Sequence, residues 1–352
     1  MSKIKVLYVI DRIMVGGAEQ VFIDIVELLE NTIDLEVLVI TATEKSQLQR
    51  IPPTVKIYEL NRNHKFSLLA LWKCKKILSN HDLVHIHLRH SYRYISLIRN
   101  LFNLSVKLIF HDHYGKIQID EKAPFAFYHF FRPDFYIGVS DSLSSWAQSV
   151  WRMPSNQTIF LQNLPRTNQT INLNCQNSEL FKCEFVLVGN IKPIKNQSFA
   201  INLVEKNNKS SIEIIGRIQD RSYYDNLEKP SNVNFNLTED NAFSKLNDFQ
   251  FGLCTSISES GPLVILEYFV AGLPFLSYKT GGIADILYKY VPEYFLDSFE
   301  INDWIERHTQ LSRNYKRIPK DLIELVLEKE FNRDIYANKL MEIYTKCLER
   351  TC

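Results

Sequence analysis

The chain has 352 residues, which predicts two domains at about 150 residues per domain. Apolar residues make up 45% and charged residues 23% of it, a composition that excludes intrinsic disorder and low-complexity structure. Lys and Arg number 41 against 40 Asp and Glu, so a net charge of +1 gives no chain-wide field that attracts nucleic acid, and we expect no nucleic-acid partner.

The compartment follows from the N-terminus, the apolar runs and the cysteines. The first apolar run, Val6 to Ile10, is too short for the core of a signal peptide, and no later run reaches the roughly 18 residues of a membrane span. The six cysteines include no C-x-x-C pair. We therefore expect a cytoplasmic protein with reduced thiols, without disulfides or a cysteine-rich zinc site.

Strand-like and helical patterns alternate through the first half. Alternation of this kind predicts a parallel sheet with helices on both faces. The helical patterns span Ala18 to Leu29 and Leu68 to Leu78. Short apolar runs predict strands at Lys5–Ile10, Leu35–Ile40, Leu83–His87, Lys107–Phe110 and Phe135–Val139.

A polar stretch from Pro165 to Lys182 is the best linker candidate, and the alternation restarts after it. A helix is predicted near Gln197 to Glu205. The fold class is therefore α/β, with two doubly wound Rossmann-like domains over residues 1–164 and 165–331. Ligands of such sheets bind at the carboxyl ends of the strands, so we expect substrates in a cleft between the domains. Strands are predicted at Glu184–Val188, Ser211–Ile215, Val233–Phe235, Phe251–Cys254 and Pro274–Ser277.

The segment from Ser258 to Glu267 carries the strongest chemical signal. A helix is predicted from Pro262 to Ala271, with Ser260 as its cap and Gly272 as its stop. The N-terminus of such a helix is an anion site that suits a diphosphate. Glu259 and Glu267 suit recognition of sugar hydroxyls and a ribose diol, with two solvent-exposed acids as the alternative.

Glycines follow two of the predicted strands. Gly16 and Gly17 open the first predicted helix, but they do not form G-x-G-x-x-G, which disfavours a nicotinamide dinucleotide. Gly189, with Lys195 six residues later, forms a second loop in which the lysine can neutralise a diphosphate. Plain βα turns and a solvated lysine remain the alternatives.

Four histidines form two H-x-H pairs at strand ends, where a period of two puts both members of a pair on one side. They are His85 with His87 and His111 with His113. Hydrogen bonding in a cleft is favoured over zinc, because no cysteine or carboxylate cluster with ligand spacing accompanies them. The absence of any Asp-x-Asp argues against a divalent metal held by carboxylates, so we expect no metal.

The sequence E-S-G-P-L-V-I-L-E-x3-A-G-L-P, which starts at Glu259, resembles the E-x(7)-E signature of glycosyltransferase family 4. The resemblance covers almost the whole chain, through Gly16-Gly17-Ala18-Glu19, D-L-V-H-I-H from Asp82, Val139-Ser140-Asp141 and Val188-Gly189-Asn190. It implies a retaining hexosyl- or other glycosyltransferase of GT-B fold that uses a nucleotide sugar. It also implies an acceptor domain before a donor domain, and a C-terminal helix over 332–352 that packs back on the first domain.

The resemblance also implies roles for individual residues. Glu267 would bind the donor ribose, Glu259 the donor sugar and Lys195 the diphosphate. The catalytic residues would be Glu259, His113 and Lys195, and the acceptor would meet His87, His111 and His113, with His111 as the alternate for His113. The donor set would be Gly16, Gly17, Gly189, Asn190, Lys195, Arg217, Glu259, Gly261, Pro262, Leu263, Val264 and Glu267. No cofactor is implied beyond the UDP- or GDP-linked donor.

One position departs from the family pattern. Asn190 stands where the family commonly has arginine, so either the amide suffices or Arg217 supplies the missing cation. The departure keeps open a protein that binds nucleotide sugars with little catalysis. A sugar-nucleotide epimerase or hydrolase is the other alternative.

The acceptor implied by the resemblance is a glycan or a lipid-linked saccharide, in the synthesis of a cell-surface polysaccharide. Two segments, His64 to Leu78 and Pro124 to Phe135, combine basic or polar residues with aromatic ones. Basic amphipathic segments with aromatics bind anionic membranes, although core packing is the alternative. Peripheral docking at the inner face of the cytoplasmic membrane is therefore left open.

Overall fold

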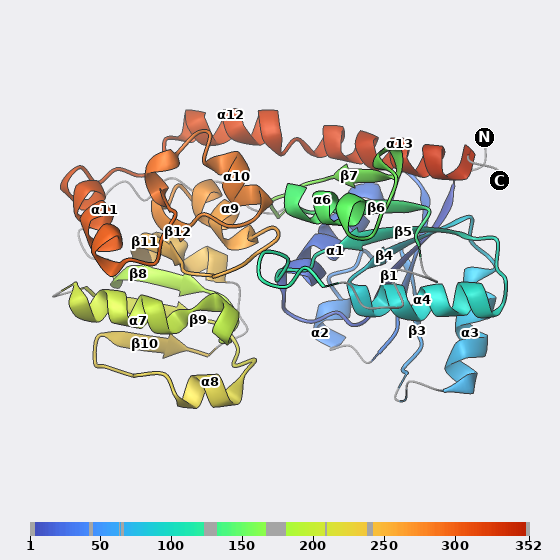
Figure 1. The fold of residues 1–352 in the computed structure, drawn as a ribbon, viewed down its shortest axis with the longest axis horizontal. Helices are drawn as coiled ribbons and strands as arrows, with labels where there is room; N and C mark the ends of the chain where they lie inside the picture. Colours follow the sequence, from blue (N-terminus) through green and yellow to red (C-terminus); the bar gives the residue numbers. More distant parts are fainter. Residues whose placement is uncertain are drawn as a thin grey trace. The chain divides into compact units, whose positions relative to one another are not determined.

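The structure, a computed structural model, describes residues 4–41, 45–62, 64, 67–122, 132–166, 181–207, 210–237 and 242–349. The chain forms two compact units, shown in Figure 1. Unit 1 holds Met1–Arg166 and Asn332–Cys352, and unit 2 holds Thr167–Phe331.

Unit 1 is built on a seven-stranded sheet in which every recorded strand pair is parallel, in the order β3-β2-β1-β4-β5-β6-β7. The strands β1 and β4 are buried along almost their whole length, as expected for a sheet covered on both faces. The strands are β1 (Lys5–Ile10), β2 (Asp34–Val39), β3 (Lys56–Glu59), β4 (Leu83–His87), β5 (Lys107–Asp112), β6 (Phe135–Gly138) and β7 (Thr158–Phe160).

The helix α4 of unit 1 buries one face. In α4, the residues Tyr92, Ile95 and Ile98 face the core at helical spacing while Arg93 and Leu97 are exposed. Trp151 lies behind them, with its ring 5.8 Å from that of Tyr92. The helices are α1 (Gly17–Leu29), α2 (Lys45–Leu48), α3 (Leu68–Leu78), α4 (Arg89–Leu101), α6 (Asp141–Ser149), the 3-10 turn η1 (Ser155–Gln157) and α13 (Arg333–Glu349).

Unit 2 repeats the plan with six strands in the order β10-β9-β8-β11-β12-β13, again parallel in every recorded pair. Its strands are β8 (Cys183–Val188), β9 (Ile212–Ile215), β10 (Val233–Asn236), β11 (Phe249–Cys254), β12 (Phe275–Tyr278) and β13 (Phe295–Leu296). Its α-helices are α7 (Gln197–Lys206), α8 (Arg221–Asp225), α9 (Leu263–Val270), α10 (Gly282–Leu287), α11 (Ile301–Arg313) and α12 (Lys320–Glu330). The 3-10 turns are η2 (Pro193–Lys195), η3 (Ala242–Asp248) and η4 (Pro292–Tyr294).

The prediction of two doubly wound α/β units is confirmed, and each predicted strand and helix has its counterpart within a few residues. The edge strands β3, β7 and β13 were not predicted, whereas the edge strand β10 was. The edge strand β3 has no fully buried residue, so its sequence lacks the apolar run that marks the central strands.

The last helix, α13, packs on unit 1. The Tyr344 hydroxyl is hydrogen-bonded to the Tyr8 hydroxyl, and the His85 Nδ1 atom lies 2.8 Å from the Tyr344 hydroxyl. Leu340 and Ile343 are buried as their spacing predicts. Ile335 of the same helix is 50% exposed.

None of the described helices is long and apolar enough to cross a membrane. Two predicted features lie largely outside the described residues: the linker from Pro165 to Lys182 and the aromatic segment from Pro124 to Phe135.

Candidate functional site

The loops after the strands of unit 2 gather a lysine and a glutamate. The Lys195 Nζ atom contacts the Glu259 Oε1 atom, and the two side chains are 19% and 16% exposed. Lys195 comes from η2, after β8, and Glu259 comes from the loop between β11 and α9. The structure thus brings together two residues that lie 64 positions apart and that sequence analysis assigned to the same site.

The backbone around Lys195 is fixed from β11. The Thr255 hydroxyl lies 3.0 Å from the Lys195 carbonyl oxygen and donates to it, and the Ile257 N–H donates to the Ile194 carbonyl oxygen at 2.9 Å. Thr255 is buried. The position of the ammonium group is therefore set by the strand that leads to Glu259, which sequence analysis did not predict.

Lys195 carries its charge at neutral pH. Burial is the largest single influence and would lower its pKa, but Glu259, Cys254 and Glu267 together outweigh it and the net pKa of Lys195 is raised. Glu267 adds to the raised pKa, which places its carboxylate within electrostatic range of the same ammonium group. One buried cation beside two carboxylates can therefore exchange an internal partner for an anionic ligand.

The loops after β8 and β9 lie against each other. A Cβ atom at Gly216 would lie 2.2 Å from the Gly189 carbonyl oxygen, and Gly216 has φ +158. The Ile191 N–H donates to the Arg217 carbonyl oxygen at 2.8 Å. The backbone of Arg217 therefore lies beside the loop that carries Asn190, and its role as a second cation stays a prediction.

The helix α9 begins one residue later than predicted. Pro262 is its N-cap residue and no side chain of the described residues caps it, so the prediction that Ser260 caps the helix is wrong. The Ser260 carbonyl oxygen instead accepts from the Gly282 N–H at 2.8 Å. Pro262 sits before the helix rather than inside its first turn, because its ψ of 96 is extended.

Close packing beneath this turn requires a glycine. Gly281 has φ +85, and a Cβ atom there would lie 2.8 Å from the Pro262 Cδ atom and 2.9 Å from the Glu259 carbonyl oxygen. The Glu259 N–H donates to the Thr280 hydroxyl at 3.1 Å. Thr280 and Gly281, in the turn after β12, thus support the loop that presents Glu259 and the free end of α9.

Glu267 lies within α9 and is 8% exposed. The next residue, Tyr268, anchors the helix: its hydroxyl accepts from the Val188 N–H at 3.1 Å and donates toward the carbonyl oxygens of Val186 and Leu253. Gly252 is needed beneath it, since a Cβ atom there would lie 2.5 Å from the Tyr268 ring. Tyr268 was missed, because an aromatic residue in an apolar helix gives no signal beyond core packing.

In unit 1, Gly16 is the N-cap residue of α1 and has an extended backbone, with φ −171. The conformation therefore does not demand glycine. A Cβ atom at Gly16 would lie 2.3 Å from the Glu19 Oε2 atom, so the side chain of Glu19 folds back over this turn. The close approach of backbone to a ligand at Gly16 and Gly17 stays a prediction.

The four histidines form one buried cluster, since β4 and β5 are neighbours and His87 pairs with His111 in register. The His85 Nε2 atom lies 3.2 Å from the His111 Nδ1 atom, and the His87 Nδ1 atom lies 3.0 Å from the His113 Nε2 atom. His87 and His111 have no exposed surface, whereas His113 is partly exposed. Of the three histidines predicted to meet an acceptor, only His113 has exposed surface, and the acceptor contacts of all three stay predictions.

The loop that carries His113 is held by an ion pair that sequence analysis missed. The buried Asp112 carboxylate accepts from the Arg89 Nε and guanidinium nitrogen atoms at 3.0 and 2.8 Å and from the Tyr114 N–H at 3.0 Å. The Arg89 guanidinium lies over the rings of Tyr114 and Trp146, at 3.8 and 4.5 Å from their centroids. The pairing across 23 residues depends on strand register, which spacing alone does not give.

The histidine cluster also has the donor atoms of a metal site. One ring nitrogen from each of His85, His87 and His111 can be chosen so that the three lie within 4.8 Å of one another. The Nε2 atoms of His87 and His111 have no hydrogen-bond partner in the structure. The predicted absence of a metal stays a prediction, and these three side chains are where an ion would bind.

Acid should destabilise unit 1 through these histidines. Burial lowers the pKa of His85, His87 and His111 well below the usual value, and the neighbouring rings lower it further. The unfolded chain binds protons below pH 6.5 that the folded chain excludes, so stability is full above that pH and falls below it. Asp24, with a pKa raised to about 7 mainly by burial, opposes the trend.

Burial lowers the pKa of His113 to about 3, so the net expected loss is about 3 kcal/mol between pH 6.5 and 5.5, from four histidines less one carboxyl. Thermal unfolding at several pH values measures it, with the exposed His90→Gln as the matched control. Replacing His87 and His111 together by Gln should remove at least about half of the pH dependence of the free energy of unfolding. A dependence equal to that of the wild type would contradict neutral buried imidazoles.

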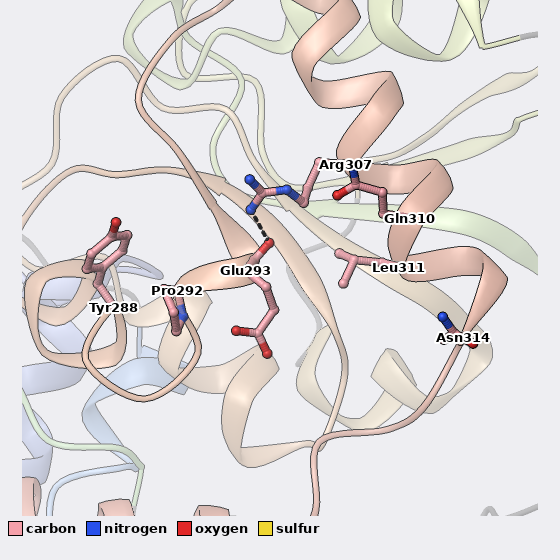
Figure 2. A pocket seen from close by; sticks show the side chains of 7 residues that line it. All are labelled: Tyr288, Pro292, Glu293, Arg307, Gln310, Leu311 and Asn314. Atoms are coloured by element: carbon pink, nitrogen blue, oxygen red, sulfur yellow. Dashed lines mark hydrogen bonds between the residues drawn. The ribbon is translucent and has the colours of Figure 1, made fainter.

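A surface hollow of about 530 Å³ lies elsewhere in unit 2, beside α11. Figure 2 shows Arg307 donating to the Glu293 carbonyl oxygen, at 2.7 Å, between Pro292 and Leu311. None of the predicted site residues lines this hollow. We therefore place the chemistry at the strand ends and not here.

The family match to known proteins lies mostly in unit 2. Residues 177–324 match the model of the family described as Glycosyl transferases group 1. The matched stretch spans the Lys195 turn, the Glu259 loop and α9. No relative was found among curated protein sequences.

Solved structures resemble the whole chain at low identity. Anabaena HepE in complex with UDP and glucose is 16% identical with a TM-score of 0.77, over 97% of this chain and 100% of that one. A glycosyltransferase from Rickettsia africae is 14% identical with a TM-score of 0.74, over 100% of both chains. The lipopolysaccharide outer core galactosyltransferase WaaB is 17% identical with a TM-score of 0.70, over 97% and 99%. The fold is therefore GT-B, as predicted.

Proposed function

We propose that the protein is a retaining glycosyltransferase of family 4 that moves a sugar from a UDP- or GDP-linked donor to a hydroxyl of a glycan or lipid-linked saccharide. The single observation that carries the proposal is the Lys195–Glu259 pair beside Glu267, at the strand ends of unit 2. The family match over residues 177–324 and the UDP bound to HepE support it. A role in the synthesis of a cell-surface polysaccharide, in the cytoplasm or at the inner membrane face, belongs to the same proposal.

The chemistry follows from charge. Departure of the nucleoside diphosphate leaves negative charge on its terminal oxygen, which a fixed cation and helix N–H groups stabilise without reorganisation. Lys195 is that cation, and the uncapped N-terminus of α9 supplies the N–H groups. Glu259 would then exchange its lysine partner for donor-sugar hydroxyls, and Glu267 would accept from the ribose diol.

Unit 1 contributes the acceptor side of the proposal. His113 is the partly exposed member of the histidine cluster, and its Nε2 atom is oriented by His87. Burial lowers the pKa of His113 to about 3, so the ring is neutral at pH 7 and positions a hydroxyl by hydrogen bonding instead of by charge.

The experiment is transfer from a panel of UDP- and GDP-sugars to glycan acceptors, with the anomeric configuration of the product followed by NMR. We expect the product to keep the configuration of the donor. Inversion would contradict the family assignment. Turnover of the donor with no acceptor dependence would indicate the epimerase or hydrolase, and binding without any turnover would indicate the non-catalytic binding protein.

Transfer should survive chelation. The proposal assigns the diphosphate to Lys195 and α9, and no Asp-x-Asp occurs in the sequence. Activity measured after dialysis against EDTA should equal the untreated activity. Complete loss that Mn²⁺ or Mg²⁺ restores would contradict this, and restoration by Zn²⁺ alone would point to His85, His87 and His111 instead.

A further inference from the structure

The charge of the chain is concentrated in one stretch of unit 1. Between Glu59 and Asp112 the sequence has nine Lys and Arg residues and one acid, Asp82. The stretch therefore carries +8, while the remainder of the chain carries −7. A near-neutral protein with such a division presents a local anion-attracting region that its overall charge conceals.

Part of this charge is used inside unit 1. Arg89 pairs with Asp112, and Arg99 and Lys107 pair with Asp134. The lysines of α3 are placed differently: Lys73 and Lys76 are exposed, and Lys75 lies over the rings of Trp72 and Phe102, 4.7 Å from each centroid. The helix α3 thus carries positive charge that no structural need of the fold accounts for.

The same helix exposes large apolar side chains. Leu68, Leu69 and Trp72 are 71%, 67% and 59% exposed, and the two leucines have the highest values among the described large apolar residues. Along α3 these three fall on the same side as Lys73 and Lys76, while Ala70, Cys74 and Leu78 are buried on the other side. Exposed leucines and tryptophan beside lysines, with no acid in the helix, are unusual for a surface that only meets water.

The neighbouring helix α4 extends this surface. Figure 1 shows α4 beside α3, and the Phe102 ring at the end of α4 lies 5.4 Å from the Trp72 ring. Leu97 and Leu101 of α4 are 47% and 60% exposed. Two adjacent helices therefore present leucines, an aromatic pair and lysines together, which we call the α3–α4 face.

We propose that the α3–α4 face docks on the anionic surface of a phospholipid membrane. Lipid headgroups would meet Lys73 and Lys76, while Leu68, Leu69 and Trp72 would enter the boundary between headgroups and acyl chains. A second copy of this chain is a poor occupant, because two such faces would bring like charges together. A soluble anionic glycan would satisfy the lysines but leave the leucines in water.

Trp72 provides a direct readout. It is exposed, whereas the three other tryptophans of the chain, Trp146, Trp151 and Trp304, are buried. Full-length protein is mixed with phosphatidylglycerol–phosphatidylcholine vesicles or pure phosphatidylcholine vesicles, with and without brominated acyl chains. We expect co-sedimentation, a blue shift and bromine quenching with the anionic vesicles only, and we expect Trp72→Phe to remove the quenching.

Variants separate lipid from other occupants. Leu68→Ser with Leu69→Ser, and Lys73→Glu with Lys76→Glu, should each weaken vesicle binding at least tenfold, because both apolar burial and charge drive interfacial binding. The matched control is Leu325→Ser with Lys329→Glu on α12, two exposed positions of unit 2. It should bind vesicles as the wild type does.

Several results would overturn the proposal. One is that the protein does not bind anionic vesicles, and another is that all variants bind them as the wild type does. A third is that only the lysine variant loses vesicle binding while the wild type binds a soluble polyanion such as heparin, which would assign the face to an anionic glycan. Vesicle binding is measured without donor or acceptor, so its failure leaves the proposed transfer reaction untouched. UDP and GDP binding in the same variants reports whether unit 2 is intact.

Discussion

Lys195→Ala should lower kcat/KM for sugar transfer by about 10²–10³-fold, since loss of one fixed group that stabilises developing negative charge costs that much in preorganised sites. Asn190 is neutral, so no second cation from that position shares the load. The variant should fold, because Lys195 is tied to the fold through its backbone contacts with Thr255 and Ile257. Steady-state kinetics with a saturating acceptor measure the effect.

The matched control is Lys206→Ala, an exposed lysine at the end of α7 in the same unit, which should leave kcat/KM unchanged. Arg217→Ala distinguishes the two interpretations of Asn190. If Arg217 supplies the second cation, its loss should be comparably damaging and Asn190→Arg should partly restore turnover. Full activity of Lys195→Ala would contradict the assignment of the diphosphate to this loop.

The two glutamates should separate binding from turnover. Glu267→Ala should weaken UDP or GDP binding by about 10-fold or more, because a buried carboxylate hydrogen-bonded to a diol contributes about 1.5–3 kcal/mol. Glu259→Ala should mainly lower kcat without weakening binding of the bare nucleotide, since Glu259 is assigned to the donor sugar, which the bare nucleotide lacks. Calorimetry and kinetics on both variants measure the two effects.

The Gln variants at both positions are the controls for shape, since they keep the side-chain volume and remove the charge. Equal nucleotide affinity in the wild type and Glu267→Ala would contradict the ribose assignment. A Glu259→Ala variant that loses nucleotide binding as severely as Glu267→Ala would show that the two carboxylates do not have separate roles.

Much of the fold is readable from the sequence because buried parallel strands such as β1 and β4 are continuous apolar runs. The post-strand glycines, Lys195 and the two glutamates were also predictable, since the carboxyl ends of parallel strands meet at one edge of a sheet. The contacts that the sequence did not predict join residues far apart in the chain. The contact of Tyr268 with β8 and the pairing of Arg89 with Asp112 depend on how layers and registers meet.

The histidines also show what sequence patterns can and cannot predict. A period of two correctly placed His85 with His87 and His111 with His113 on common sides of their strands. It could not say how deeply each ring is buried, and depth decides the role: His113 alone is partly exposed. Ser260 likewise fits a cap by residue type, but the turn at Pro262 directs its carbonyl to Gly282.

The most direct test of the central claim, that unit 2 holds a nucleoside diphosphate between Lys195 and α9, is calorimetric titration of the wild type with UDP, GDP and their nucleosides in EDTA. We predict one site per chain for one of the two diphosphates, with its nucleoside at least 10-fold weaker, and a difference that Lys195→Ala largely removes. A nucleoside that binds as tightly as its diphosphate, or a Lys195→Ala variant with wild-type affinity, would contradict the account.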